Sequence, residues 1–192
     1  MNPIAADKTL RLIREKRVSI QVERLLTALV FTVVTGLCAK LRFYLPFTPV
    51  PVTGQVFAVL LAGIFLGKSY GSMSQVFYIL FGLAGVPWFV IGPAGPTWGY
   101  LVGFMLAPYV IGLIRERAKH LNILTNVCAA LAGILTIYSL GLIHFSVYMQ
   151  SGVIRSFQLA VLPFIPIDIG KALVAAFIAQ LLFRKTELQI KS

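Results

Sequence analysis

The feature that most constrains this chain is a succession of long apolar runs that contain very few charged residues. Hydrophobic residues make up 58% of the 192 residues and charged residues 12%, and the mean hydropathy is +0.88. A soluble domain of this length cannot bury so much apolar surface, so the composition indicates a protein that crosses a membrane several times. Because spanning helices satisfy their own backbone hydrogen bonds, we predict an all-α fold.

The apolar runs are long enough to define individual membrane spans, since about 20 apolar residues cross a bilayer as a helix. We predict six transmembrane helices, with approximate bounds Leu25–Leu41, Gly54–Leu66, Ser69–Leu83, Thr97–Ile114, Leu121–Ile143 and Phe164–Phe183. The second is short and is expected to be tilted or partly re-entrant. The chain is then a single membrane domain (1–192), with a basic N-terminal segment (1–24), a six-helix bundle (25–183) and a short tail (184–192).

Lysines and arginines are distributed unevenly between the two sides of these predicted spans. With the N-terminus in the cytoplasm, the inner segments contain Lys8, Arg11, Arg14, Lys16, Arg17, Arg24, Lys68, Arg115, Arg117, Lys119, Arg184, Lys185 and Lys191. The outer segments contain only Lys40, Arg42 and Arg155. This positive-inside pattern predicts that both termini are cytoplasmic and that the protein lies in the cell membrane. The net charge of +11 is therefore a topology signal with some attraction to anionic lipid, and we expect no nucleic-acid partner.

Two charged residues lie inside the last apolar run. Asp168 and Lys171 are three residues apart, so on a helix they share one face. A charge embedded in a membrane is costly unless it is paired or engaged, and an exposed pair at this spacing contributes only a few tenths of a kcal/mol. We therefore predict that the two residues bind a small ligand with hydrogen-bond donors at one end and a carboxylate at the other. The alternative is a self-neutralising pair that serves only insertion and packing.

The segment between the first two predicted spans is apolar but cannot be helical. Residues 44–55 contain three prolines within six positions, which impose a stiff, extended path. Ordered non-helical backbone in a membrane protein usually lines a cavity. We predict a lid over a binding pocket, with ligand contacts from Thr48, Val50, Pro51, Thr53 and Gln55. The alternative is a loop that only packs on the top of the bundle.

A second outer segment, residues 85–100, is rich in glycine, proline and aromatic residues and has no charge. We predict that Trp88, Trp98 and Tyr100 form an aromatic wall of the pocket, with an interfacial aromatic belt as the alternative. Thr97 is a candidate N-cap for the span that follows.

Small residues recur at every fourth position on several predicted helices, a pattern that lets helices approach closely. On the first span the series is Ala28, Thr32 and Gly36, and we predict that it docks a partner protein. The other series are expected to pack within the chain, and they include Gly63, Gly67, Gly71, Gly99, Gly103 and Ala107.

The sequence contains no signature of an enzyme or of a cofactor site. It has no P-loop, no nucleophile elbow and no paired metal-binding histidines. The two cysteines and two histidines are isolated in the sequence, so we expect no metal site. Acid–base catalysis would require a second reactive group beside Asp168, the one embedded carboxylate, and the sequence indicates none.

At this level of detail the chain resembles a known family. The matching stretches are Pro49–Gln55, Leu61–Gly67, Gly85–Phe89, Gly95–Phe104 and Pro166–Ala172. They occur in the order found in BioY, the substrate-binding component of biotin uptake systems of the energy-coupling-factor type. The resemblance covers roughly residues 22–183. It implies a six-helix membrane fold with cytoplasmic termini and a high-affinity biotin site near the outer face, capped by the first outer loop.

The resemblance also implies partners and roles. A transmembrane coupling subunit and two ATPases would supply the energy, which agrees with the missing nucleotide motif, and the first helix would dock the coupling subunit. Asp168 and Lys171 match the ligand-contacting residues of the last helix. The ureido N–H groups of biotin suit Asp168, and we expect Lys171 to meet its carboxylate. Two alternatives remain open: a binding subunit for another vitamin, and an intramembrane enzyme acting on lipid.

One departure from the family pattern follows Trp88. The family usually has a longer glycine-rich loop there, with polar side chains that reach the ligand. Residues 90–95 are shorter and carry no polar side chain. Some ligand hydrogen bonds are then expected to come from backbone, water or other residues.

Overall fold

The computed structural model describes the backbone of residues 3–88 and 95–191 and the side chains of residues 18–88 and 95–183. The described chain is mainly helical, with one short two-stranded ribbon. In chain order the elements are α1 (Pro3–Lys40), β1 (Arg42–Phe43), β2 (Val52–Thr53), α2 (Gln55–Leu83), α3 (Trp98–Arg117), α4 (Ile123–Tyr148), α5 (Val153–Ala160), the 3₁₀ turn η1 (Leu162–Phe164) and α6 (Ile165–Lys191).

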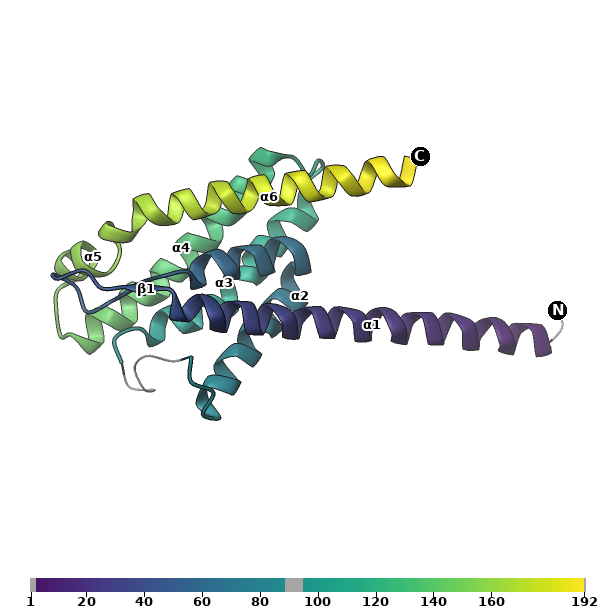
Figure 1. The fold of residues 1–192 in the computed structure, drawn as a ribbon, viewed down its shortest axis with the longest axis horizontal. Helices are drawn as coiled ribbons and strands as arrows, with labels where there is room; N and C mark the ends of the chain where they lie inside the picture. Colours follow the sequence, from purple (N-terminus) through teal and green to yellow (C-terminus); the bar gives the residue numbers. More distant parts are fainter. Residues whose placement is uncertain (1–2, 89–94, 192) are drawn as a thin grey trace.

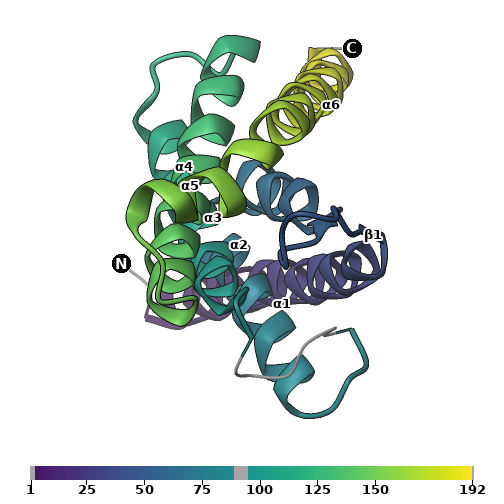
Figure 2. The same ribbon diagram turned by 90° about the vertical axis from the view of Figure 1, so that its left-hand side faces the viewer.

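The long helices form an elongated bundle with two distinct ends (Figure 1). The N-terminal end of α1 and the C-terminal end of α6 lie at the same end, which we call the terminal end. The ribbon that contains β1 and the short helix α5 lie at the opposite end, which we call the loop end. Viewed from the loop end, β1 lies between α1 and α6 (Figure 2).

Within the described residues, five helices are long and apolar enough to cross a membrane: Val18–Lys40, Gln55–Leu83, Trp98–Arg117, Ile123–Tyr148 and Val153–Phe183. The chain is therefore an all-α membrane protein, as the sequence predicts, but the predicted second and third spans are not two separate elements. Both lie within α2.

A sharp break at Gly67 divides α2 into two halves. Gly67 has φ 71° and ψ −169°, a conformation that glycine adopts at little cost because it has no Cβ atom. The two halves fold back on one another, since Gln55 Nε2 donates to the Tyr78 hydroxyl at 2.8 Å. Gly67 was expected to belong to a helix-packing series, and that prediction is wrong: the residue turns the chain instead.

The basic N-terminal segment is continuous with the first membrane helix. The backbone is helical from Pro3 to Lys40, so no break separates the segment from the apolar part of α1.

Other small residues do pack within the chain as predicted. A Cβ atom at Gly103 in α3 would lie 2.7 Å from the Cα of Ile137 in α4, and one at Gly63 in α2 would lie 2.9 Å from Ile111 in α3. These contacts leave no room for a side chain, so the glycines allow α2, α3 and α4 to approach closely. The central core of the bundle is built around them.

Polar side chains hold the terminal end together. The guanidinium of Arg115 donates to Asn126 Oδ1 at 2.9 Å and to the backbone carbonyl of Ile64, and it lies 5.0 Å from the centre of the Phe183 ring. Ile64 is in the last turn before the break in α2, where carbonyl groups lose their intrahelical donors. Arg115 therefore joins α2, α3, α4 and α6 and satisfies an acceptor that the break exposes.

Candidate functional site

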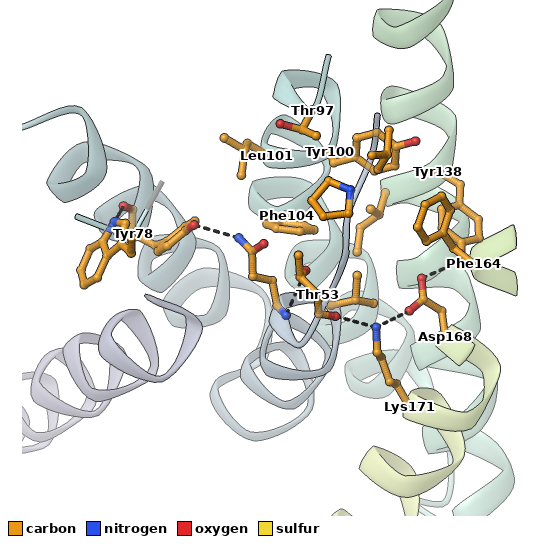
Figure 3. Close-up of a pocket in the computed structure, with 16 residues that line it drawn as sticks. Thr53, Tyr78, Thr97, Tyr100, Leu101, Phe104, Tyr138, Phe164, Asp168 and Lys171 are labelled. Carbon is orange, nitrogen blue, oxygen red and sulfur yellow. Dashed lines mark hydrogen bonds and ion pairs between the residues drawn. The ribbon is translucent and has the colours of Figure 1, made fainter. Parts of the chain in front are cut away.

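A cavity of about 90 Å³ opens at the loop end, between α2, α3, α4, α6 and the first connecting loop (residues 41–54) (Figure 3). Most of its lining is apolar or aromatic, with a few polar groups, as is typical of small-molecule sites. It is lined by Val50, Pro51, Thr53, Gln55, Val56, Tyr78, Trp88, Thr97, Tyr100, Leu101, Phe104, Ile137, Tyr138, Phe164, Asp168 and Lys171.

The two charged residues predicted from the sequence meet at one wall of this cavity. Asp168 lies in the first turn of α6 and Lys171 one turn later. Lys171 Nζ donates to Asp168 Oδ1 at 2.7 Å, and the side chains are only 17% and 5% exposed, respectively. The predicted side-by-side arrangement is therefore present, and the pair is largely withdrawn from solvent.

Hydrogen bonds extend from this ion pair to two other elements. The Tyr138 hydroxyl, on α4, donates to Asp168 Oδ2 at 2.7 Å, and Lys171 Nζ donates to the backbone carbonyl of Thr53 at 2.7 Å. Figure 3 shows the resulting chain from α4 through α6 to the first connecting loop. Both oxygen atoms of Asp168 accept hydrogen bonds, as suits an ionised carboxylate, which is an acceptor only.

The distance between the two charged groups bears on the expected ligand. We expected Asp168 to meet hydrogen-bond donors at one end of a ligand and Lys171 to meet a carboxylate at the other. The ammonium and the carboxylate instead lie 2.7 Å apart, at one wall of the cavity. The pair therefore suits a group in which N–H donors and a carbonyl are neighbours.

The first connecting loop forms another wall, and its non-helical path is confirmed. Its two short strands pair in antiparallel fashion, with Arg42 opposite Thr53. Val50, Pro51 and Thr53 line the cavity. The loop thus reaches the ion pair directly, through the Thr53 carbonyl.

Thr48 and Gln55, both predicted ligand contacts, have different positions. Thr48 is buried outside the cavity lining, and its hydroxyl accepts a hydrogen bond from the Val50 amide at 3.2 Å. It therefore supports the turn of the loop. Gln55 begins α2 and lines the cavity, with its amide nitrogen bonded to Tyr78.

Two of the three predicted aromatic residues line the cavity. The Trp88 indole N–H donates to the backbone carbonyl of Tyr78 at 3.1 Å, and the two rings lie 5.4 Å apart. The Tyr100 hydroxyl donates to the Ala160 carbonyl at 2.5 Å. Trp98 lies outside the lining and packs against the cluster that contains Tyr78 and Ile79. The aromatic wall is therefore formed by Trp88 and Tyr100 without Trp98.

Thr97 occupies the N-cap position of α3, as predicted, but its side chain makes no capping hydrogen bond. It lines the cavity instead. A capping residue normally uses its side-chain oxygen for the helix N-terminus, so the prediction holds for the position of Thr97 and is wrong for its contact.

Tyr78 and Tyr138 are polar residues of the site that the sequence did not single out. A buried tyrosine hydroxyl requires a hydrogen-bond partner, so a tyrosine inside an apolar run indicates a polar contact in the interior. The partner could not be identified from that signal, because Tyr138 and Asp168 lie on different helices. The remaining lining residues, such as Phe104 and Phe164, are apolar residues that cannot be distinguished in the sequence from those of an ordinary hydrophobic core.

The small residues predicted to dock a partner face the interior of the chain. Ala28 and Thr32 are completely buried, and Thr32 donates to the Ser74 carbonyl of α2 at 2.8 Å. Gly36 is buried beneath the Trp88 ring. These contacts assign the face to packing on α2 and Trp88, in place of partner docking. The exposed face of α1 is formed by Leu26, Val30, Val33 and Leu37.

The segment expected to offer no polar side chain to a ligand is residues 90–95. Residues 90–94 lie outside the described residues, and Gly95 is buried. Its carbonyl lies 3.2 Å from the His144 ring nitrogen Nε2.

The chain is similar to proteins of one family. The model of the BioY family matches residues 13–187. A biotin transporter BioY from Thermotoga maritima is 37% identical over 151 residues, which cover 76% of this chain and 87% of the relative. A probable biotin transporter BioY from Pyrococcus horikoshii is 38% identical over 138 residues, which cover 69% and 80% of the two chains.

The fold also matches a solved structure, the crystal structure of an S-component for biotin from an ECF-type ABC transporter. The TM-score is 0.77 at 24% sequence identity, and the match covers 86% of this chain and 93% of the other. At this identity the likeness concerns the fold. Together with the match over residues 13–187, it leads to one conclusion: the chain belongs to the BioY family.

Proposed function

We propose that this protein binds biotin at the outer face of the cell membrane and delivers it inward as the substrate-binding component of an energy-coupling-factor transporter. The observation that carries the proposal is the buried ion pair of Asp168 and Lys171, which borders an apolar cavity in a chain of the BioY family. A buried ion pair is weak support for stability, because removing two charges from water costs about as much as their attraction returns. Binding of a ligand would explain why two charges are buried although they add little to the stability of the fold.

Biotin has the chemistry that this cavity requires. Its ureido ring places N–H donors beside a carbonyl, which suits an acceptor carboxylate and a donor ammonium 2.7 Å apart. Its thiophane ring and its chain are apolar and suit the surfaces of Trp88, Tyr100 and Val50. The valerate carboxylate then needs donors away from the ion pair.

We propose the six-span arrangement with both termini in the cytoplasm. The break at Gly67, which divides α2 into two halves, supports this count. The N-terminal end of α1 and the C-terminal end of α6 lie at the same end of the bundle (Figure 1), and both terminal segments are rich in lysine and arginine in the sequence. Because short inner loops are enriched in lysine and arginine, this end faces the cytoplasm and the cavity opens outward. We propose that the membrane is the plasma membrane, where the positive-inside pattern is expected.

The chain needs partners to supply energy. Its sequence has no nucleotide-binding motif. We propose that a transmembrane coupling subunit and two ATPase subunits associate with it, and that this chain is itself neither an ATPase nor another enzyme. The exposed apolar face of α1 is available to lipid or to the coupling subunit.

A competition titration tests the ligand assignment. The protein, purified in detergent, is titrated with biotin by calorimetry and then with thiamine and riboflavin as competitors. We expect saturable biotin binding that neither vitamin displaces. Displacement by thiamine or riboflavin at similar concentrations would assign the site to another vitamin. Binding followed by chemical turnover of added phospholipid would instead support the intramembrane enzyme.

A further inference from the structure

Tyr138 contacts the carboxylate of the proposed site from a different helix. It lies on α4, and its hydroxyl donates to Asp168 Oδ2, on α6, at 2.7 Å. Tyr138 is 8% exposed and Asp168 4% exposed, so water has little access to this bond. A hydrogen bond to a charged group in such a setting is stronger than one between neutral groups.

The two protein donors approach Asp168 from different directions. Lys171 donates to Oδ1 from the same helix, and Tyr138 donates to Oδ2 from α4. The terminal torsion of an aspartate is otherwise broad, so a single donor leaves the plane of the carboxylate poorly defined. With both donors in place the plane is fixed.

Each carboxylate oxygen has room for about two hydrogen bonds, and the protein uses one on each. The unused lone pairs belong to the Asp168 carboxylate, which lines the cavity. Their direction is therefore set by Tyr138 as well as by Lys171.

We propose that Tyr138 is a positioning residue: it orients Asp168 so that the free lone pairs meet the N–H donors of a cyclic urea. This inference rests on the proposed function, because it concerns the same ligand. Tyr138 acts on specificity through Asp168, and it discriminates ligands that offer N–H groups from ligands of the same shape that do not.

Tyr100 provides a matched control. It is a second buried tyrosine that lines the cavity, but its hydroxyl donates to the Ala160 carbonyl instead of to Asp168. Tyr100→Phe and Tyr138→Phe remove the same atom from the same kind of side chain. Only the second removes a contact to the carboxylate.

The experiment is a double-mutant cycle on biotin binding, measured by calorimetry on the purified protein. We expect Tyr138→Phe to weaken binding about tenfold in the native chain. In the Asp168→Asn background it should weaken binding less than about twofold, because the amide has one acceptor oxygen and no charge. Tyr100→Phe should have the same effect in both backgrounds. An equal loss from Tyr138→Phe in both backgrounds overturns the inference.

A second measurement keeps the inference testable if Asp168→Asn binds too weakly to titrate. Biotin and an analogue methylated on one ureido nitrogen are compared in the native chain and in Tyr138→Phe. The native preference for biotin should fall about tenfold in the variant, and an unchanged preference overturns the inference. Thermal unfolding of each variant separates a loss of fold from a loss of positioning.

If the folded native protein binds no biotin, the proposed function fails as well. If it binds biotin and Tyr138→Phe binds equally well, only the positioning role fails.

Discussion

Two ion pairs lie at opposite ends of this molecule, and their lengths are nearly the same. Lys171 Nζ lies 2.7 Å from Asp168 at the loop end, and Lys68 Nζ lies 2.6 Å from Glu116 at the terminal end. Their surroundings differ: the first pair is 17% and 5% exposed, the second 35% and 48%. The distance between the charged atoms therefore does not distinguish the two ion pairs, whereas their burial does.

The pair at the terminal end is of the kind that contributes little to stability, because solvent screens it and its long side chains lose freedom. The buried pair is different, since its desolvation is compensated only if further hydrogen bonds complete its coordination. Tyr138 and the Thr53 carbonyl provide two of those bonds, and lone pairs of Asp168 remain free for a ligand. The exposed pair ties the break in α2 to α3. For the buried pair, we propose that it binds a ligand.

The largest expected effect follows from breaking the buried pair. Asp168→Asn leaves the Lys171 ammonium without its counter-charge and removes the acceptor for the ligand. Leaving buried N–H donors of the ligand without their acceptor costs about 1–3 kcal/mol each, so we expect biotin affinity to fall about 100-fold or more. Calorimetry on the purified protein measures it. Glu116→Gln, which breaks the exposed pair, is the control, and an equal loss in both variants would refute the contrast between the two ends.

A smaller effect is expected when the cation is replaced. Lys171→Met keeps much of the side-chain volume but removes the donor to Asp168 and to the Thr53 carbonyl. We expect biotin affinity to fall about tenfold and the backbone amides of the first connecting loop to exchange faster with deuterium. Hydrogen exchange with mass spectrometry measures the second effect. Unchanged exchange in residues 41–54 would show that Lys171 does not hold the loop.

A further test concerns the support of the cavity wall, away from any charge. A Cβ atom at Gly36 would collide with the Trp88 ring, so Gly36→Val should displace Trp88 and weaken biotin binding about fivefold. Gly152→Ala is the control, because a Cβ atom there meets nothing within 4 Å. Tryptophan fluorescence and calorimetry measure the two effects. Native affinity in Gly36→Val would mean that Trp88 is not a binding surface.

The smallest effect is expected at the exposed pair. Lys68→Gln should leave biotin affinity within about twofold of the native value, because solvent already screens this pair. Its thermal midpoint should also shift less than that of Lys171→Met. A change in biotin affinity of more than about fivefold would show that the two ends of the bundle are coupled. The exposed and the buried ion pair would then not differ in their effect on binding as described above.

Local features of the site were predictable from the sequence. Asp168 and Lys171 are neighbours because residues three apart share a helix face, whatever the rest of the fold does. The prolines of the first connecting loop exclude a helix in the same local way. Lys68, beside Gly67, interrupts an apolar run, and the sequence therefore predicts two separate spans there. The structure has one helix, α2, with a break at Gly67.

Features that depend on how helices rotate and pack were not predictable. The spacing of Ala28, Thr32 and Gly36 shows that they share a face of α1, but it does not say which neighbour that face meets. The same limit applies to Tyr138, whose partner lies 30 residues away on another helix. Trp88 and Trp98 are both aromatic residues at the loop end, and only the packing of the loop distinguishes the one that lines the cavity.

We propose that the buried ion pair of Asp168 and Lys171 serves a ligand and not the fold. The most direct test replaces both charges together, in Asp168→Leu combined with Lys171→Met, and measures thermal unfolding and biotin affinity on the same purified sample. Apolar replacement of a whole buried pair is often neutral or stabilising, so we expect a folded protein with near-native thermal stability and biotin affinity lowered at least about 100-fold. A folded double variant that binds biotin as tightly as the native chain would show that the ion pair does not bind the ligand.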